Sequence, residues 1–213
     1  MRYICALSIC LWLWTTNTIA MQLQPVVEMD NEDFEISFPV KNDGLFENNF
    51  ELTAQETTFP EKGYRVLDDQ AHALTIYPKV LTLSPGETGI FHIANKTKSR
   101  SERYFRLNIT QTNSLHKSTM DNHKKTNGNI YFPLQISSNL IVRPSMPIFN
   151  YEIKERRFHN LSNGYVLLMQ DGLYGAEKTK VVPPGRWVDI PHGNKGSGLY
   201  VGFIDKIKII SNS

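Results

Sequence analysis

Six histidines and a few serine and acidic residues are the side chains that could hold a metal or take part in nucleophilic catalysis. The histidines are scattered along the chain, at His72, His92, His116, His123, His159 and His192. None has a second ligand at the spacing that zinc sites use. Ser84 and Asp171 have no histidine partner at the spacing of a known catalytic motif. The sequence therefore predicts no metal site, no cofactor and no enzyme activity.

The strongest pattern in the sequence is an alternation of apolar and polar residues from 130 to 142. The apolar members share one parity, which is interrupted at Ser138: Ile130, Phe132, Leu134, Ile136, Leu140 and Val142. Alternation with period two is typical of a β-strand with one apolar face. Two interpretations fit this strand: an ordinary core strand, or an edge strand that pairs with another chain.

Alternation along most of the chain indicates an all-β protein. Turn residues interrupt the apolar pattern roughly every 8–12 positions. Besides the segment above, the expected strands are residues 36–42, 50–54, 74–78 with a continuation through Val80, Leu81 and Leu83, 90–94, 104–109, 158–161, 165–169, 186–190 and 199–204. We expect the first two to pair with each other, because Asp43 and Gly44 provide a turn after the first. Residues 114–129 are rich in Ser, Thr, Asn, His and Lys and predict an exposed loop.

A proline-containing segment, residues 143–147, predicts a domain boundary. Each proline blocks regular continuation of the chain, so the segment is expected to be a stiff linker. The predicted domains are residues 21–144 and residues 145–213. The second has about 65 residues, which is small for a sandwich that folds alone, so we expect it to lean on the first.

Residues 1–20 have the features of a cleavable secretory signal. Arg2 carries a positive charge, residues 4–14 are almost entirely apolar, and Thr18 and Ala20 supply the small residues before a cleavage site. Both cysteines of the sequence lie in this segment, so a mature chain would have no disulfide. We expect an exported protein with no stable membrane insertion. The formal charge of +2 comes with no dense basic cluster, so we expect no nucleic-acid partner.

Four segments of the chain, taken in order, resemble the periplasmic chaperones of the chaperone–usher pathway, which assemble pili and fimbriae. Residues 40–56 are similar to an early hairpin of those proteins. Residues 76–87 resemble their "P…L…PG" segment, and residues 101–109 resemble their "E-x-x-F-x-L-N" strand. The fourth segment is the alternating strand that ends before Pro144. The second predicted domain matches less well and is closer to the alternative branch of the family.

The resemblance implies two immunoglobulin-like β-sandwich domains in a boomerang arrangement, the second domain being small. It implies a periplasmic chaperone that binds pilin or fimbrial subunits by donor-strand complementation, aids their folding, prevents premature polymerisation and delivers them to an outer-membrane usher. The chaperone's edge strand stands in for the strand that the subunit lacks, which is a form of β-augmentation. Carried over to this chain, the donor side chains are Ile130, Phe132, Leu134 and Ile136.

The family's anchor for the carboxyl terminus of the subunit does not carry over directly. Members outside the alternative branch use a Lys in the donor strand and an Arg in the first strand. Here Asn139 stands at the Lys position, and residues 21–40 contain no Lys or Arg. The anchor is therefore absent, replaced or located elsewhere in the chain. The candidate replacements are Asn139, whose amide could donate a hydrogen bond, and Lys41, the nearest upstream cation.

Three further residues resemble the family's interdomain salt-bridge set: Glu102, Arg143 and Asp205. This resemblance implies that the set holds the two domains at a fixed angle. Arg143 is accordingly expected to have a structural role and not to bind a ligand.

Other functions remain open from the sequence alone. The chain could be a structural pilus subunit or an adhesin, which would need a donor extension at its N-terminus, and residues 21–33 are the candidate for it. A secreted enzyme is a third possibility, without a motif to support it. In a chaperone, the exposed edge strands of two copies could pair with each other in self-association.

Overall fold

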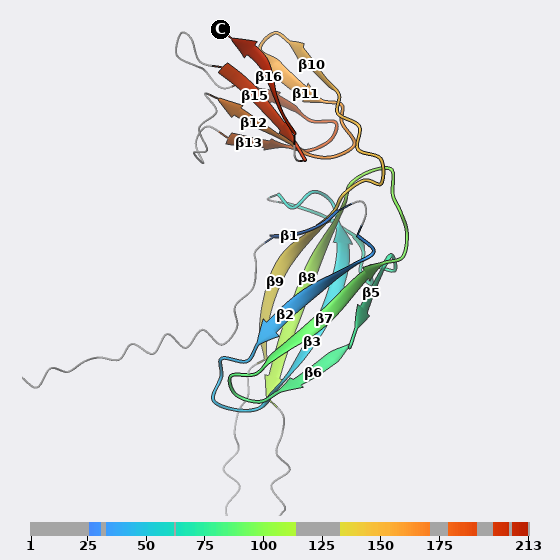
Figure 1. Ribbon diagram of the computed structural model, residues 1–213, viewed down its shortest axis with the longest axis vertical. Coiled ribbons are helices and arrows are strands. Elements are labelled where there is room, and N and C mark those ends of the chain that lie inside the picture. The colour runs from blue at the N-terminus through green and yellow to red at the C-terminus, as the bar shows by residue number, and fades with distance from the viewer. Residues whose placement is uncertain are drawn as a thin grey trace, which may run out of the picture.

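The computed structural model describes residues 26–30, 33–61, 63–113, 133–170, 179–190, 198–204 and 206–212 of the chain. Every regular element in these ranges is a β-strand, which confirms the predicted all-β class. Figure 1 shows two blocks of strands, one above the other, joined through the segment that follows β9. The described ranges contain no helix with the length and apolar character needed to cross a membrane.

The first block is a sandwich of two sheets. Its strands are β1 (Val26–Met29), β2 (Glu35–Lys41), β3 (Asn48–Thr57), β4 (Val66–Asp68), β5 (Leu74–Tyr77), β6 (Val80–Leu83), β7 (Thr88–Asn95), β8 (Arg103–Asn113) and β9 (Leu134–Val142). One sheet has the order β1-β9-β8-β3-β4, with β6 also paired to β3, and the other has the order β2-β7-β5. Burial alternates along β2 and β3, as expected for strands with one apolar face.

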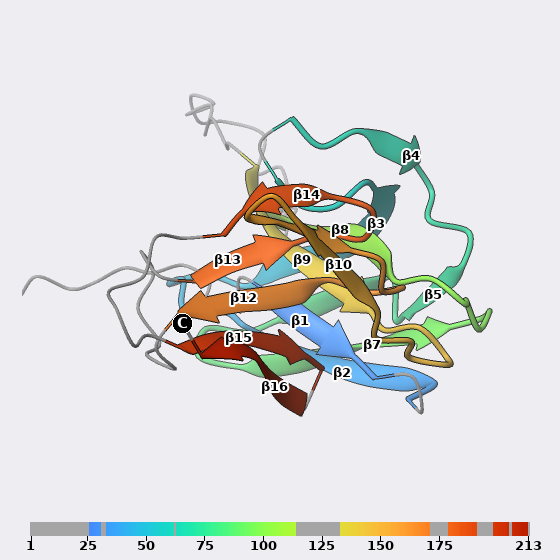
Figure 2. The same ribbon diagram turned by 90° about the horizontal axis from the view of Figure 1, so that it is seen from above.

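The second block also has two sheets. Its strands are β10 (Tyr151–Lys154), β11 (Arg157–Asn160), β12 (Val166–Gln170), β13 (Thr179–Val182), β14 (Trp187–Asp189), β15 (Gly198–Phe203) and β16 (Lys206–Asn212). The sheet orders are β10-β11-β14 and β13-β12-β15-β16, and the second order can be followed in Figure 2.

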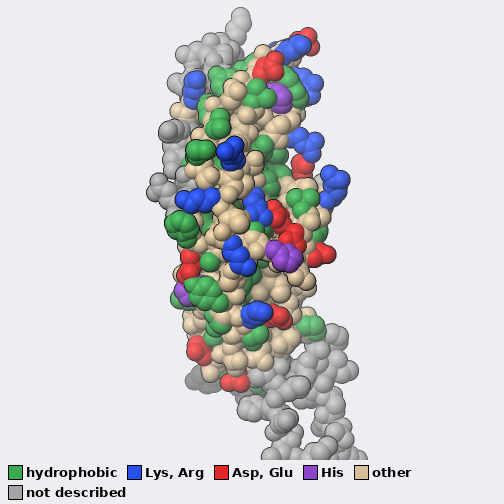
Figure 3. Space-filling model, turned by 90° about the vertical axis from the view of Figure 1, so that its right-hand side faces the viewer, with side chains coloured by type: hydrophobic (Ala, Val, Ile, Leu, Met, Phe, Trp, Pro, Cys, Tyr) green, Lys and Arg blue, Asp and Glu red, His purple; other side chains and the backbone are tan. Residues whose placement is uncertain are grey.

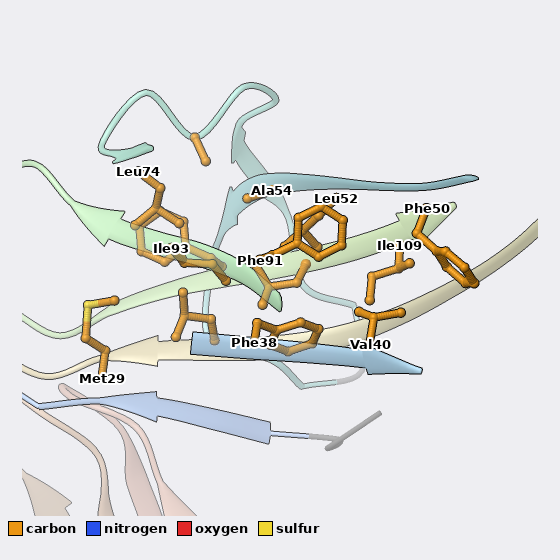
Figure 4. Packing of buried hydrophobic residues seen from close by; sticks show 14 of the residues in the cluster. Met29, Phe38, Val40, Phe50, Leu52, Ala54, Leu74, Phe91, Ile93 and Ile109 are labelled. Atoms are coloured by element: carbon orange, nitrogen blue, oxygen red, sulfur yellow. The ribbon is translucent and has the colours of Figure 1, made fainter. Parts of the chain in front are cut away.

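Each block has its own hydrophobic core. The core of the first block draws its buried residues from Met29 to Val142, and it includes Phe50 and Phe91, both fully buried. Figure 4 shows these side chains meeting between the two sheets. The core of the second block is smaller and runs from Phe158 to Phe203. The predicted boundary at residue 144 lies between the two sets of core residues.

The predicted pairing of residues 36–42 with residues 50–54 is wrong. β2 pairs with β7, and β3 pairs with β8. Val40 in β2 and Phe50 in β3 are both fully buried in the same core, so the two strands face each other from opposite sheets. The turn between them therefore crosses from one sheet to the other.

Candidate functional site

β9 has one fully paired edge and one partly paired edge. β8 runs antiparallel to β9 and pairs with it from Leu134 to Val142. On the opposite edge, β1 runs parallel to β9 and pairs with Asn139–Val142. No residue in the described ranges pairs with residues 134–137 on this edge, which we call the open edge. Outward backbone N–H and C=O groups along the open edge are therefore available to a strand of another chain.

The apolar face of β9 emerges from the core toward the open edge. Leu140 is fully buried, and Ile136 is half-buried against the core of the first block. Leu134, at the start of the strand, is 41% exposed. Both Leu134 and Ile136 were predicted as donor side chains and share this face. The other two predicted donors, Ile130 and Phe132, lie outside the described residues.

The structure does not bring the two candidate carboxylate anchors together. Asn139 is half-buried and is the first residue of β9 that β1 covers, opposite Val26. Lys41 ends β2 in the other sheet, where its ammonium lies 2.6 Å from the carboxylate of Asp43. Asn139 thus marks the point at which the open edge ends, whereas Lys41 has an acidic partner of its own.

Arg143, which directly follows β9, forms the most buried ion pair in the described ranges. Its Nη1 lies 2.6 Å from Oε2 of Glu102, and the two side chains are 5% and 0% exposed. Its Nη2 lies 2.8 Å from Oε2 of Glu28 in β1. Removing two charges from water is unfavourable unless they are paired and hydrogen-bonded, as they are here. Asp205, the third residue of the predicted set, lies outside the described residues.

Tyr165 brings the second block onto this ion pair. Its ring centroid lies 4.2 Å from the guanidinium carbon of Arg143, within the range of a cation–π interaction. The Tyr165 hydroxyl donates to Oε1 of Glu28 at 2.7 Å, and its backbone N–H donates to Oε1 of Glu102 at 3.2 Å. The hydroxyl of Tyr104 also donates to Oε1 of Glu102, at 2.5 Å. We call these five residues the Arg143 cluster.

The protonation states of the Arg143 cluster follow from burial and charge. Burial and the neighbouring Glu102 carboxylate raise the pKa of Tyr104 above its ordinary range. Burial and the hydrogen bond to Glu28 raise the pKa of Tyr165 to about 12. Burial alone would lower the pKa of Arg143, but Glu102 and its other neighbours raise it overall. Near neutral pH both tyrosines are therefore neutral donors, and Arg143 is charged.

Three further contacts join the two blocks. The side-chain amide of Asn163 donates to the backbone carbonyl of Arg100 at 2.6 Å, and the backbone N–H of Glu102 donates to the carbonyl of Asn163 at 2.9 Å. At the surface, Arg186 lies 3.0 Å from Glu61, with both side chains exposed. Together with the Arg143 cluster, these contacts hold the second block against the end of β9.

The described residues contain no group of three His, Cys, Asp or Glu side chains that could hold a metal ion. His72 lies beside Asp68, and His92 lies beside Glu35, each 2.9 Å from an acidic oxygen. On the face shown in Figure 3, acidic and basic side chains are interspersed and do not form a basic patch.

Sequence reasoning missed Glu28 and Tyr165. Glu28 stands in an acidic stretch with no local signal for a buried partner, and it meets Arg143 from 115 positions away. Tyr165 was expected as a strand residue, yet β12 begins after it, at Val166. Its contacts with Arg143 and Glu28 depend on how the second block lies on the first.

Comparisons with known proteins identify the fold. No protein-family model matches the chain, and no curated protein matches it by sequence. The crystal structure of the class 5 fimbriae chaperone CfaA matches with a TM-score of 0.58 at 11% identity, over 89% of this chain and 98% of that chain. A chain of the chaperone–tip adhesin complex of CFA/I fimbriae biogenesis matches with a TM-score of 0.55 at 11% identity, over 89% and 97%.

The periplasmic chaperone SfaE is also similar, with a TM-score of 0.52 at 12% identity, over 85% of this chain and 90% of that chain. In each case the match extends over both blocks of strands. The chain therefore has the fold of the fimbrial chaperones, with two immunoglobulin-like domains, as the resemblance predicted. The boomerang arrangement stays a prediction.

Replacing Arg143 tests the Arg143 cluster. In Arg143→Ala, Glu102 stays buried without its cation, so we expect a loss of about 3–5 kcal/mol in the free energy of unfolding. Arg186→Ala, which breaks the exposed pair with Glu61, is the matched control and should lose at most about 1 kcal/mol. Urea denaturation followed by circular dichroism measures both. Equal, small losses would mean that the buried pair does not stabilise the fold.

The raised pKa of Tyr165 predicts that stability falls at alkaline pH. A tyrosine has an ordinary pKa of 10.0, whereas Tyr165 in the folded chain has a pKa of about 12. Between these values the folded state binds more protons than the unfolded state, so the free energy of unfolding decreases as pH rises. Urea denaturation across this window should show a shallower decrease for Tyr165→Phe than for wild type. Identical slopes for wild type and Tyr165→Phe would mean that other groups cause the loss of stability at alkaline pH.

Proposed function

We propose that this chain, which has the fold of the fimbrial chaperones, is itself a chaperone that binds a pilin or fimbrial subunit through β9. The observation that carries the proposal is the open edge of residues 134–137, which lies on the same strand as the emerging apolar side chains of Leu134 and Ile136. A subunit strand that paired there would satisfy the outward backbone groups of β9.

Apolar burial supplies the free energy of this interaction. Donor-strand complementation would place Leu134, Ile136 and the two predicted donors, Ile130 and Phe132, in the groove that a subunit's missing strand leaves open. At about 25 cal/mol per Å² of apolar surface removed from water, four such side chains contribute several kcal/mol before the cost of ordering. Backbone pairing would also fix the register of the subunit strand on β9, because a shift of one residue would turn these side chains away from the groove.

The extent of β1 supports a defined end for the bound strand. Because β1 already pairs with Asn139–Val142, a subunit strand can extend along β9 as far as Ser137 while β1 stays in place. The amide of Asn139 stands next to that end and is our first candidate for the anchor of the subunit's carboxyl terminus. Lys41 is the second candidate, although its pairing with Asp43 in the other sheet does not favour it.

The proposal includes the rest of the predicted role. The chaperone would act in the periplasm after removal of residues 1–20, with residues 21–144 and 145–213 as its two domains. It would aid subunit folding, prevent premature polymerisation and deliver subunits to an outer-membrane usher, without a cofactor or a catalytic step. Glu102 and Arg143 would hold the domains at a fixed angle. Free copies could pair through their open edges in self-association.

A structural subunit or adhesin is less well supported. Such a protein would give an N-terminal extension to its neighbour, and residues 21–33 are the candidate extension. Val26–Met29 of that segment already form β1 and pair with β9 of the same chain. Met29 is also fully buried in the core of the first block, so this part of the segment contributes to its own fold.

Co-expression with candidate subunits tests the proposal. Leu134→Asp places a charge on the donor face, whereas Gln135→Asp places the same charge on the opposite face of the same strand. We expect wild type and Gln135→Asp to co-purify with a subunit at a ratio of one to one. Leu134→Asp should lose most of the subunit, while circular dichroism shows an intact fold. Equal recovery with both variants would contradict binding through this face of β9.

A further inference from the structure

The turn between β2 and β3 carries two strongly exposed apolar side chains. Leu45 is 80% exposed and Phe46 is 70% exposed, the highest values among the large hydrophobic residues of the described ranges. Neither side chain belongs to the hydrophobic core of the first block, so a polar residue at either position would lose no core contact. Packing within the chain therefore does not account for these apolar side chains, and adjacent exposed hydrophobic residues are typical of interaction surfaces.

Buried side-chain amides hold this turn in place. Asn42 is 0% exposed, and its Nδ2 donates to the carbonyl of Phe46 and to the carbonyl of Leu83, each at 2.8 Å. Asn48 is 2% exposed, and its Nδ2 donates to the same Phe46 carbonyl at 3.0 Å. The backbone N–H of Gly44 donates to Oδ1 of Asn42 at 3.0 Å. Leu45 and Phe46 thus project from a backbone that is already fixed. Binding a partner would therefore cost little conformational entropy in this turn.

The turn lies at the end of the sandwich where the open edge begins. A Cβ built on Gly44 would stand 4.0 Å from the side-chain amide of Gln111, near the end of β8. Gln111 pairs directly with Leu134, the first residue of β9. Figure 1 shows the turn at the lower end of the first block, where β8 also ends. The turn therefore lies at the Leu134 end of this sheet, next to the strand that pairs with the other edge of β9. A subunit bound along residues 134–137 would reach Leu45 and Phe46 by extending around this end of the sheet.

We propose that Leu45 and Phe46 form a second contact site for the same subunit that pairs with β9, an inference that rests on the proposed function. The site fits an apolar patch on the body of the subunit, next to the groove that receives Leu134. The subunit is favoured over other partners because the turn lies at the same end of the sheet as Leu134, where the open edge begins. Backbone pairing along β9 gives little information about the identity of the subunit, whereas two side chains in a patch can discriminate between subunits.

A subunit-exchange experiment tests this site. Wild-type chaperone loaded with subunit is mixed with an excess of a differently tagged, subunit-free variant, and the subunit on each is measured at equilibrium. We expect the double variant Leu45→Ser with Phe46→Ser to hold the subunit about tenfold or more weakly than wild type. The control variant, Ile153→Ser with Val181→Ser, changes two exposed apolar residues of the second block and should partition like wild type.

The outcomes separate this inference from the proposed function. If Leu134→Asp loses the subunit but the turn variant partitions like wild type, the second contact site is wrong and the β9 proposal stands. If Leu134→Asp also keeps the subunit, both the β9 proposal and the second contact site are wrong. A melting temperature of the turn variant several degrees below wild type would show that Leu45 and Phe46 support the fold, and would overturn the site. The site would also be overturned if the turn variant kept the subunit but lost chaperone self-association, because Leu45 and Phe46 would then bind a second copy of the chaperone.

Discussion

The buried guanidinium of Arg143 is the interaction that joins the separate parts of this structure. Its side chain binds Glu28 in β1 and Glu102, and its backbone N–H donates to the carbonyl of Met29 at 2.9 Å. A buried cation must keep such partners, because losing one leaves an uncompensated charge. The same guanidinium lies against Tyr165, so the packing of the second block and the position of β1 are set at one point.

The position of β1 divides β9 into two parts with different roles. Where β1 pairs with it, β9 contributes to the core of the first block, as the buried Leu140 and Val142 illustrate. Beyond the end of β1, the strand keeps its pairing with β8 but exposes its other edge and, at Leu134, its apolar face. A long unpaired apolar edge is a liability for aggregation in most proteins. Here β1 shortens it and the proposed subunit would cover the remainder.

The sequence was informative where a strand carries its own alternation and uninformative where a contact comes from afar. β7 and β9 alternate over most of their length and were predicted from that pattern alone. β1 was not predicted, because its four residues stand in an acidic stretch without alternation and form a strand only through parallel pairing with β9. β4, β10, β13 and β16 were missed as well, the first three being strands of three or four residues.

The wrong pairing of β2 with β3 has the same origin. Asp43 and Gly44 indicate a turn but not whether the chain returns to its own sheet or crosses to the other. Side-chain contacts of the Arg143 cluster likewise depend on tertiary packing: Glu102 and Arg143 came from the family resemblance, whereas Glu28 and Tyr165 had no signal.

Amide hydrogen exchange of the chaperone, alone and with bound subunit, tests the central claim most directly. Backbone N–H groups already bonded to β8 or β1 are protected in both states, whereas those along the open edge exchange freely without a partner. The account predicts that subunit binding slows exchange at alternate residues within 134–137 and leaves residues 139–142 unchanged. Slowed exchange elsewhere, with residues 134–137 unaffected, would contradict it.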